Sequence, residues 1–136
     1  MGRAMASKQG RGITVAQLHA LCDDWPGVTR DVKWSDNVVF SVGGKMFVMT
    51  HADGREGGRL AFKAADERFL ELTDQPGVMP APYLARARWV AVAEPLRFTT
   101  AELAALLLDA YATVRAKLSK KAQAALGPLP TLEDGR

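Results

Sequence analysis

Two adjacent glycines between two β-rich runs constrain the fold of this chain more than any other feature. The runs are residues 38–42, Val-Val-Phe-Ser-Val, and residues 45–50, Lys-Met-Phe-Val-Met-Thr, with Gly43-Gly44 between them. A two-residue hairpin turn of type I′ requires positive φ at both central positions, which glycine adopts without steric penalty. The pattern therefore predicts an antiparallel β-hairpin that turns at Gly43-Gly44.

Further alternating segments predict that this hairpin belongs to a larger sheet. Residues 28–34 alternate with period two after the break at Trp25-Pro26-Gly27, and residues 59–63 and 88–93 have the composition of two more strands. Residues 52–58 form a polar, glycine-rich loop, a candidate tip for a second wing. Residues 78–83 hold two prolines, which remove backbone donors, and are predicted to be an ordered extended loop.

Helical spacing and capping residues predict the helices. Thr14 with Gln17 and Thr99 with Glu102 match capping boxes, at the start of apolar stripes over residues 14–24 and 99–118. Asp66 is predicted to cap a short helix over residues 66–74. Residues 119–126 either continue the last helix or begin a short new turn. Strands and helices together predict an α+β fold.

The length of 136 residues is typical of one domain with its own core. We expect a flexible amino-terminal arm over residues 1–12, one domain over residues 13–126, and a carboxy-terminal tail over residues 127–136. The single cysteine, the lack of a signal sequence and the lack of a long apolar stretch predict a cytoplasmic protein without a membrane anchor. A monomer is the favoured oligomeric state.

The candidate groups for catalysis are sparse. His19 and Cys22 lie three residues apart on the first predicted helix, as a metal-binding pair or a nucleophile and base would. Cys22 also falls on the apolar stripe, and no third ligand stands at metal-binding spacing, so a core position is favoured. The glycine pair lacks the pattern of a phosphate-binding loop. We expect no enzyme activity, no metal and no cofactor.

Basic residues next to aromatic residues are the more informative pattern. The net charge is +3, and several lysines and arginines flank Trp34, Phe47, Phe62 and Trp89. Successive side chains of a strand point to opposite faces of the sheet. Aromatic rings in the core therefore leave the neighbouring lysine and arginine side chains on the outer face, where these cations can neutralise phosphates. The candidate phosphate contacts are Lys33, Lys45, Arg55, Arg59, Lys63, Arg86 and Arg88. The later run of Arg115, Lys117, Lys120 and Lys121 is explained by the dipole at the end of the last helix, with direct phosphate contact as the alternative.

Several ordered motifs resemble the MmcQ/YjbR family. They are the segments at residues 25–28 and 31–47, then 60–63, 76–83, 89–90, 109–111 and 117–121, which together span residues 14–126. The resemblance implies a CyaY-like α+β fold, an antiparallel sheet of about five strands with helices packed on it. It also implies a double-wing DNA-binding protein, in which the Gly43-Gly44 turn with Lys45 is a candidate wing tip.

This chain departs from relatives of that fold at two places. Frataxin-like proteins bind iron through an acidic first helix, whereas the first helix here ends in only Asp23-Asp24 and the protein is basic. Many family members carry histidine where this chain has Arg88. The first hypothesis is therefore double-stranded DNA binding through hairpin tips and a basic sheet face. The alternative is a small-ligand or protein-interaction domain with a pocket under the Pro80–Tyr83 loop.

Overall fold

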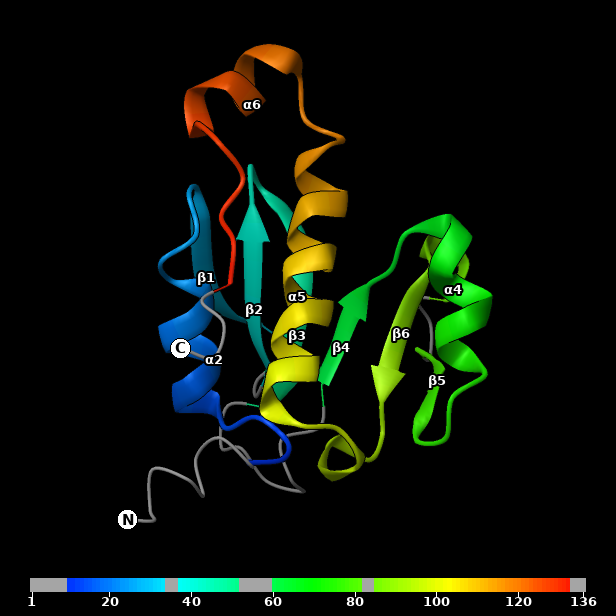
Figure 1. Cartoon of the computed structure of the whole chain (residues 1–136). Helices are drawn as coiled ribbons and strands as arrows, with labels where there is room; N and C mark the ends of the chain where they lie inside the picture. Colours follow the sequence, from blue (N-terminus) through cyan, green and yellow to red (C-terminus); the bar gives the residue numbers. More distant parts are fainter. Residues whose placement is uncertain (1–9, 34–36, 52–59, 82–84, 133–136) are drawn as a thin grey trace.

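One antiparallel sheet organises the molecule (Figure 1). The structure is a computed structural model that describes residues 10–33, 37–51, 60–81 and 85–132. Within these ranges the sheet has six strands, in the order β1-β2-β3-β4-β6-β5. The strands are β1 (Val28–Lys33), β2 (Asn37–Val42), β3 (Lys45–His51), β4 (Leu60–Lys63), β5 (Val78–Pro80) and β6 (Trp89–Val92). The predicted α+β class with an antiparallel sheet is confirmed.

The β2–β3 hairpin turns where the sequence predicts it. Val42 pairs with Lys45 across the turn, and Gly43 and Gly44 have φ values of 59° and 80°. Both glycines therefore use the left-handed region that other residues avoid. The alternation of residues in β2 places Phe40 and Val42 in the core, and both are fully buried.

The sheet has one strand more than expected. The additional strand is β5, which lies in the segment predicted to be an extended loop because of its prolines. Val78 pairs with Val92 and Pro80 with Val90, so β6 supplies all of the pairing and β5 is an edge strand. Proline lacks the N–H that a central strand needs, but an edge strand tolerates it.

The α-helices in the described ranges lie on the same side of the sheet in Figure 1. They are α2 (Val15–Cys22), α4 (Asp66–Thr73), α5 (Thr100–Arg115) and α6 (Lys120–Leu126), joined by the short 3₁₀ helices η1 (Ala85–Ala87) and η2 (Pro95–Arg97). Helix α5 packs mainly against β2, β3 and β4, and α4 against β5 and β6. No helix in these ranges has the length and apolar character needed to cross a bilayer.

Both predicted capping boxes form. Thr14 Oγ1 accepts the Gln17 N–H at 3.0 Å, and Thr99 Oγ1 accepts the Glu102 N–H at 3.0 Å. Two helix boundaries differ from prediction. The cap of α4 is Ala65, not Asp66, and no side chain caps this helix.

The predicted last helix is divided in two. Helix α5 ends at Arg115, and α6 begins after Ser119, whose hydroxyl accepts the Ala122 N–H at 3.1 Å. The hydroxyl of Ser119 thus begins a new helix, since a capping serine satisfies a backbone donor that has no partner within the helix. Of the two alternatives predicted for residues 119–126, the new turn is the correct one, and it forms the separate helix α6.

The core lies between the sheet and the helices, and aromatic rings form its centre. Trp25, Phe47 and Tyr111 are buried with ring centroids 5.2–6.1 Å apart. Phe62 and Trp89 are buried as predicted, whereas Trp34 lies outside the described residues. Because Tyr111 is fully buried, its hydroxyl needs a partner, and it donates to the Pro26 carbonyl at 2.7 Å.

Residues 10–12, which the sequence places in the amino-terminal arm, contact the segment before α5. The Gly12 N–H donates to the Phe98 carbonyl and the Thr100 N–H donates to the Gly10 carbonyl, both at 2.9 Å. The Arg11 guanidinium also donates to the carbonyls of Leu96 and Arg97. These bonds attach the start of the described chain to the end of the sheet where α5 begins.

Candidate nucleic-acid interface

The strand register brings four of the predicted phosphate contacts to one end of the sheet. Lys45 is the first residue of β3, directly after the hairpin turn. Lys63 is the last residue of β4 and pairs with Trp89, the first residue of β6. Because β3 and β4 are antiparallel, Lys45 and Lys63 share this end, and Arg86 and Arg88 precede β6 there.

Lys33 lies at the other end of the sheet. Val28, at the start of β1, pairs with Val42 beside the hairpin turn, whereas Lys33 pairs with Asn37. The register therefore separates Lys33 from Lys45 along the sheet, because alternation assigns a face of the sheet but not an end. Arg55 and Arg59 lie outside the described residues.

Lys63 is the most enclosed of these cations. Its ammonium donates to the Ala87 carbonyl, and the residue is half-buried. Burial lowers the pKa of Lys63, and the positive charges of Lys117 and, more weakly, Arg88 lower it further, while Asp66 acts in the opposite direction. The positive charges repel one another in the free protein. An anionic partner that binds all of them removes this repulsion, so the cluster favours its binding.

Arg88 has an unusual backbone. Its φ of 64° is the only positive value among the described residues other than glycine, and the chain enters β6 one residue later than predicted. The guanidinium lies 5.3 Å from the centroid of the Phe69 ring, and its Nε is 3.7 Å from Asp66. The side chain remains about half exposed, at 48%. Arg88 is thus held on α4 while its charge faces solvent.

The later run of basic residues does not lie where the dipole explanation requires. Arg115 ends α5 and is buried, but Lys120 and Lys121 are in the first turn of α6, which holds no acid. The amino-terminal end of a helix carries positive partial charge, so cations there are unfavourable. The dipole explanation is therefore wrong for Lys120 and Lys121, which are both exposed. Ser119, a capping residue, is the sequence signal that would have revealed this.

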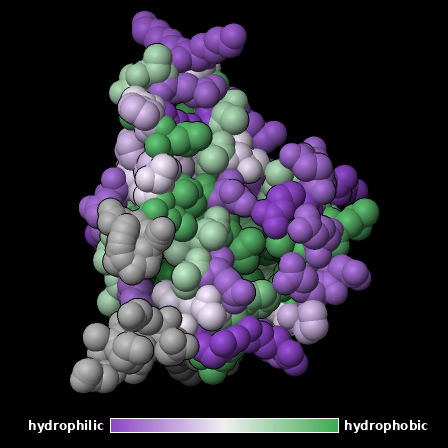
Figure 2. All heavy atoms as spheres, viewed as in Figure 1, coloured by the Kyte–Doolittle hydropathy of each residue, from purple (hydrophilic) through white to green (hydrophobic). Residues whose placement is uncertain are grey.

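Helix α6 lies at the same end of the sheet as Lys45. Leu118, just before α6, comes within 2.7 Å of the position that a Cβ of Gly43 would occupy. Leu126, at the end of α6, lies beside Gly27 and Val42. Figure 2 shows hydrophilic side chains projecting where α6 forms that end of the molecule. We call the following set the basic end: Lys45, Lys63, Arg86, Arg88, Lys117, Lys120 and Lys121.

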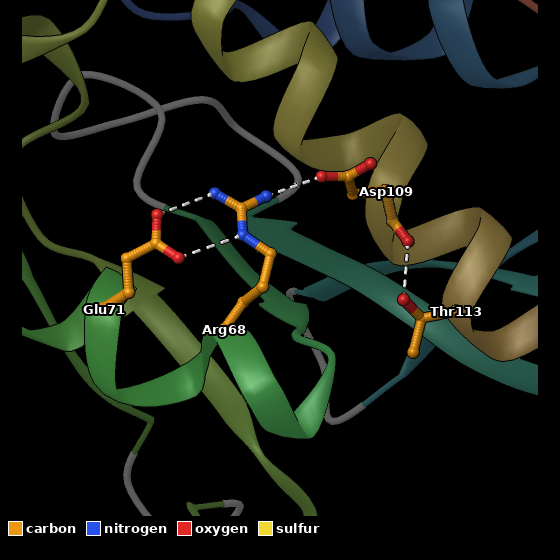
Figure 3. A network of polar contacts seen from close by, with 4 residues as sticks. All are labelled: Arg68, Glu71, Asp109 and Thr113. Atoms are coloured by element: carbon orange, nitrogen blue, oxygen red, sulfur yellow. Dashed lines mark hydrogen bonds and ion pairs between the residues drawn. The ribbon is translucent and has the colours of Figure 1, made fainter.

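A groove between α4 and α5 is the second feature of the surface. It consists of two hollows of about 290 and 270 Å³ that share Arg68, Leu72, Leu106 and Asp109 as lining residues. Arg68 on α4 crosses it and donates to Asp109 on α5 at 2.7 Å and to Glu71 at 3.4 Å (Figure 3). The pocket predicted under the Pro80–Tyr83 loop cannot be described, because Pro82 and Tyr83 lie outside the described residues.

The two groups considered for catalysis are both on α2, where Cys22 is the buried last residue and His19 is half-buried. Burial, with a smaller effect of Asp23, raises the pKa of the Cys22 thiol to about 12. Cys22 is therefore protonated at neutral pH and is a poor nucleophile. The His19 ring packs edge-on against Phe40, and its buried Nε2 has no hydrogen-bond partner in the described part of the chain. In that part no group of three or more potential metal ligands is placed to hold an ion.

The YjbR family model matches residues 23–113, two thirds of the chain and nearly all of the sheet. The chain belongs to the YjbR family. The predicted resemblance is thus confirmed. Four members of the basic end, Lys45, Lys63, Arg86 and Arg88, lie within the YjbR match, and the three lysines from Lys117 onward follow it.

This YjbR chain is similar to two solved structures. One is a Deinococcus radiodurans protein with a DUF419 domain, at a TM-score of 0.79 and 29% identity over 94% of this chain and 98% of that chain. The other is a Pseudomonas syringae protein, at a TM-score of 0.61 and 19% identity over 75% of this chain and 99% of that chain, a likeness of fold alone. No curated protein matches this chain.

Proposed function

We propose that this YjbR-family protein is a cytoplasmic, non-enzymatic protein that binds double-stranded DNA through its basic end. The observation that carries the proposal is the position of Lys120 and Lys121. They are exposed cations at the end of a helix whose dipole opposes them, so the fold gives no stabilising reason for their charge. They stand with Lys45, Lys63 and Lys117 at one end of the sheet.

The proposed contacts are with backbone phosphates, not with bases. Lysine and arginine side chains that neutralise phosphates position a protein on DNA without reading sequence. Phe47, Phe62 and Trp89 are buried in this protein, so these rings cannot stack on unpaired bases. Single-strand binding relies on such stacking, which favours duplex DNA as the partner of the basic end.

Salt dependence tests the proposal. Titration of duplex DNA at several salt concentrations should give an affinity that falls steeply as salt rises, with about 0.9 in slope for each phosphate contacted. The double variant Lys120→Ala/Lys121→Ala should reduce that slope by about 2, while the charge-preserving control Lys120→Arg/Lys121→Arg keeps it. No binding of the wild type at low salt, or binding that is indifferent to salt, contradicts the proposal.

The groove between α4 and α5 supports a second candidate function, the binding of a small molecule. Its floor includes Phe62 and Leu72, which are both buried, and its hollows are near the lower end of the usual range for ligand pockets. Stabilisation by a neutral metabolite in a thermal-shift screen, without stabilisation by DNA, would favour this function. Loss of that stabilisation in Leu106→Trp, which fills the groove, would assign the ligand to it.

A further inference from the structure

Arg115 is a buried cation whose hydrogen-bond partners within the described residues are all uncharged. The residue is 5% exposed, and its Nη1 donates to the Tyr111 hydroxyl at 3.0 Å. Its Nη2 donates to the carbonyls of Gln123 and Gly127. A charged group in the interior is costly unless hydrogen bonds replace those lost from water. These neutral acceptors therefore determine where the guanidinium lies.

The carbonyls that Arg115 binds belong to the last turn of α6. Gln123 is within that helix, and Gly127 is its carboxy-terminal cap. None of the residues of α6 is fully buried, and Leu126 is its half-buried residue packed against the core. Leu126 rests beside Gly27, and the Gln123 amide donates to the Leu118 carbonyl at 2.8 Å. Arg115 thus links the end of α6 to the interior of the domain by hydrogen bonds.

The same guanidinium is connected to the rest of the core through Tyr111. The Tyr111 hydroxyl accepts from Arg115 and donates to the Pro26 carbonyl at 2.7 Å. One chain of hydrogen bonds therefore joins the turn between α2 and β1, helix α5 and the end of α6. These hydrogen bonds hold the end of α6, and the first turn of the same helix carries Lys120 and Lys121.

We infer that Arg115 is a positioning residue for DNA binding, which fixes α6 so that Lys120 and Lys121 remain at the basic end. This role rests on the proposed function, but Arg115 itself is buried and touches no phosphate. Arg115 thus contributes to DNA binding from the interior, although the sequence groups it with the surface lysines.

The test is a comparison of Arg115→Met in two backgrounds. In the wild-type background the substitution should weaken duplex DNA binding and lower the salt slope by about 2, the share of Lys120 and Lys121. In the Lys120→Ala/Lys121→Ala background it should have no further effect, because the side chains that it positions are already absent. An equal loss of affinity in both backgrounds, or an unchanged slope, overturns the inference.

Hydrogen exchange without DNA separates this inference from the proposed function. Amides of residues 120–127 should exchange at least tenfold faster in Arg115→Met, with the sheet unchanged. If the wild type binds no DNA but this change occurs, the proposed function fails while the attachment of α6 by Arg115 stands. Unchanged exchange overturns the inference. Should Arg115→Met not fold, Leu126→Ala, which loosens α6 from Gly27, should give the same exchange and binding pattern.

Discussion

The two glycines of the β2–β3 turn differ in their surroundings. A Cβ on Gly43 would lie 2.7 Å from the methyl carbons of Leu118, whereas a Cβ on Gly44 would meet nothing within 4 Å. Both residues have positive φ, so alanine at either position is strained by about 1–2 kcal/mol. Gly43 therefore has a second constraint, the connection between α5 and α6 that packs against it.

We expect Gly43→Ala to be more destabilising than Gly44→Ala in chemical denaturation. Gly44→Ala should lower the free energy of unfolding by about 1–2 kcal/mol through backbone strain alone. Gly43→Ala should lower it further, because Leu118 must leave its position against the core. Equal losses in the two variants would show that Leu118 moves without cost.

Lys63 makes the stability of the protein depend on pH in the alkaline range. Its pKa in the folded protein is below the usual lysine value of 10.5, chiefly because of burial and of the positive charge of Lys117. Between these two pKa values the unfolded chain binds more protons than the folded one, so the Lys63 contribution to stability rises with pH. The Lys63 contribution is present in full above pH 10.5 and is lost as the pH falls through the folded-state pKa.

This contribution is measurable as a difference between wild type and Lys63→Met. The wild type should gain stability relative to the variant as the pH is raised toward 10.5. The difference removes the effect of Cys22, whose raised pKa acts in the opposite direction above pH 9.0 in both proteins. A difference that does not vary with pH would contradict the shift.

At the scale of elements, the Tyr111 hydroxyl joins α5 to the turn before β1 and, through Arg115, to the end of α6. Tyr111→Phe keeps the ring among Trp25 and Phe47 but leaves the Pro26 carbonyl and an Arg115 N–H without this partner. We expect the free energy of unfolding to fall by about 1–3 kcal/mol, the usual cost of a buried polar group left unsatisfied.

The matched control is Thr113→Val on the same helix. The Thr113 hydroxyl donates to the Asp109 carbonyl one turn earlier in α5, at 2.8 Å, and to no other group in the described part of the chain. Such a bond competes with the helix and adds little to stability, so this variant should stay within about 0.5 kcal/mol of wild type. A Tyr111→Phe variant as stable as this control would show that water replaces the hydroxyl.

Local signals made most elements predictable from the sequence. The hairpin at Gly43-Gly44 and the capping boxes at Thr14 and Thr99 depend on residues close in the chain, and all three are confirmed. Strand β5 was not predictable, because Pro80 is compatible with a strand only at a sheet edge. Which strand lies at an edge is a property of the whole sheet.

The sequence predicted which residues form the candidate site, but it predicted only part of their arrangement in the fold. Alternation identified Lys45 and Lys63, which the structure brings to one end. It could not separate them from Lys33, because the end of a sheet at which a residue lies depends on strand direction and register. One capping residue, Ser119, begins the separate helix α6 and so places Lys120 and Lys121 in its first turn. The helical pattern of the sequence continues across Ser119 without a break, and this continuity obscured the cap.

For the whole molecule, the result is an uneven distribution of positive charge along the sheet. Lys45 and Lys33 have the same chemistry but lie at opposite ends. If DNA contacts the basic end, Lys45→Ala should weaken duplex binding and lower the salt slope by about 1, whereas Lys33→Ala should leave both unchanged. Fluorescence anisotropy over a salt series measures both quantities. Equal effects of the two substitutions would place the interface elsewhere.

The groove between α4 and α5 separates the helices into two groups, and this separation affects local opening of the fold. Helix α4 packs mainly on β5 and β6, and α5 on β2, β3 and β4, so the two halves meet through one shared hydrophobic core, the β4–β6 ladder and the Arg68–Asp109 ion pair. An exposed ion pair contributes at most about 1 kcal/mol. We expect the amides of α4, β5 and β6 to exchange faster than those of β2 and β3, because fewer contacts hold this half to the rest of the domain.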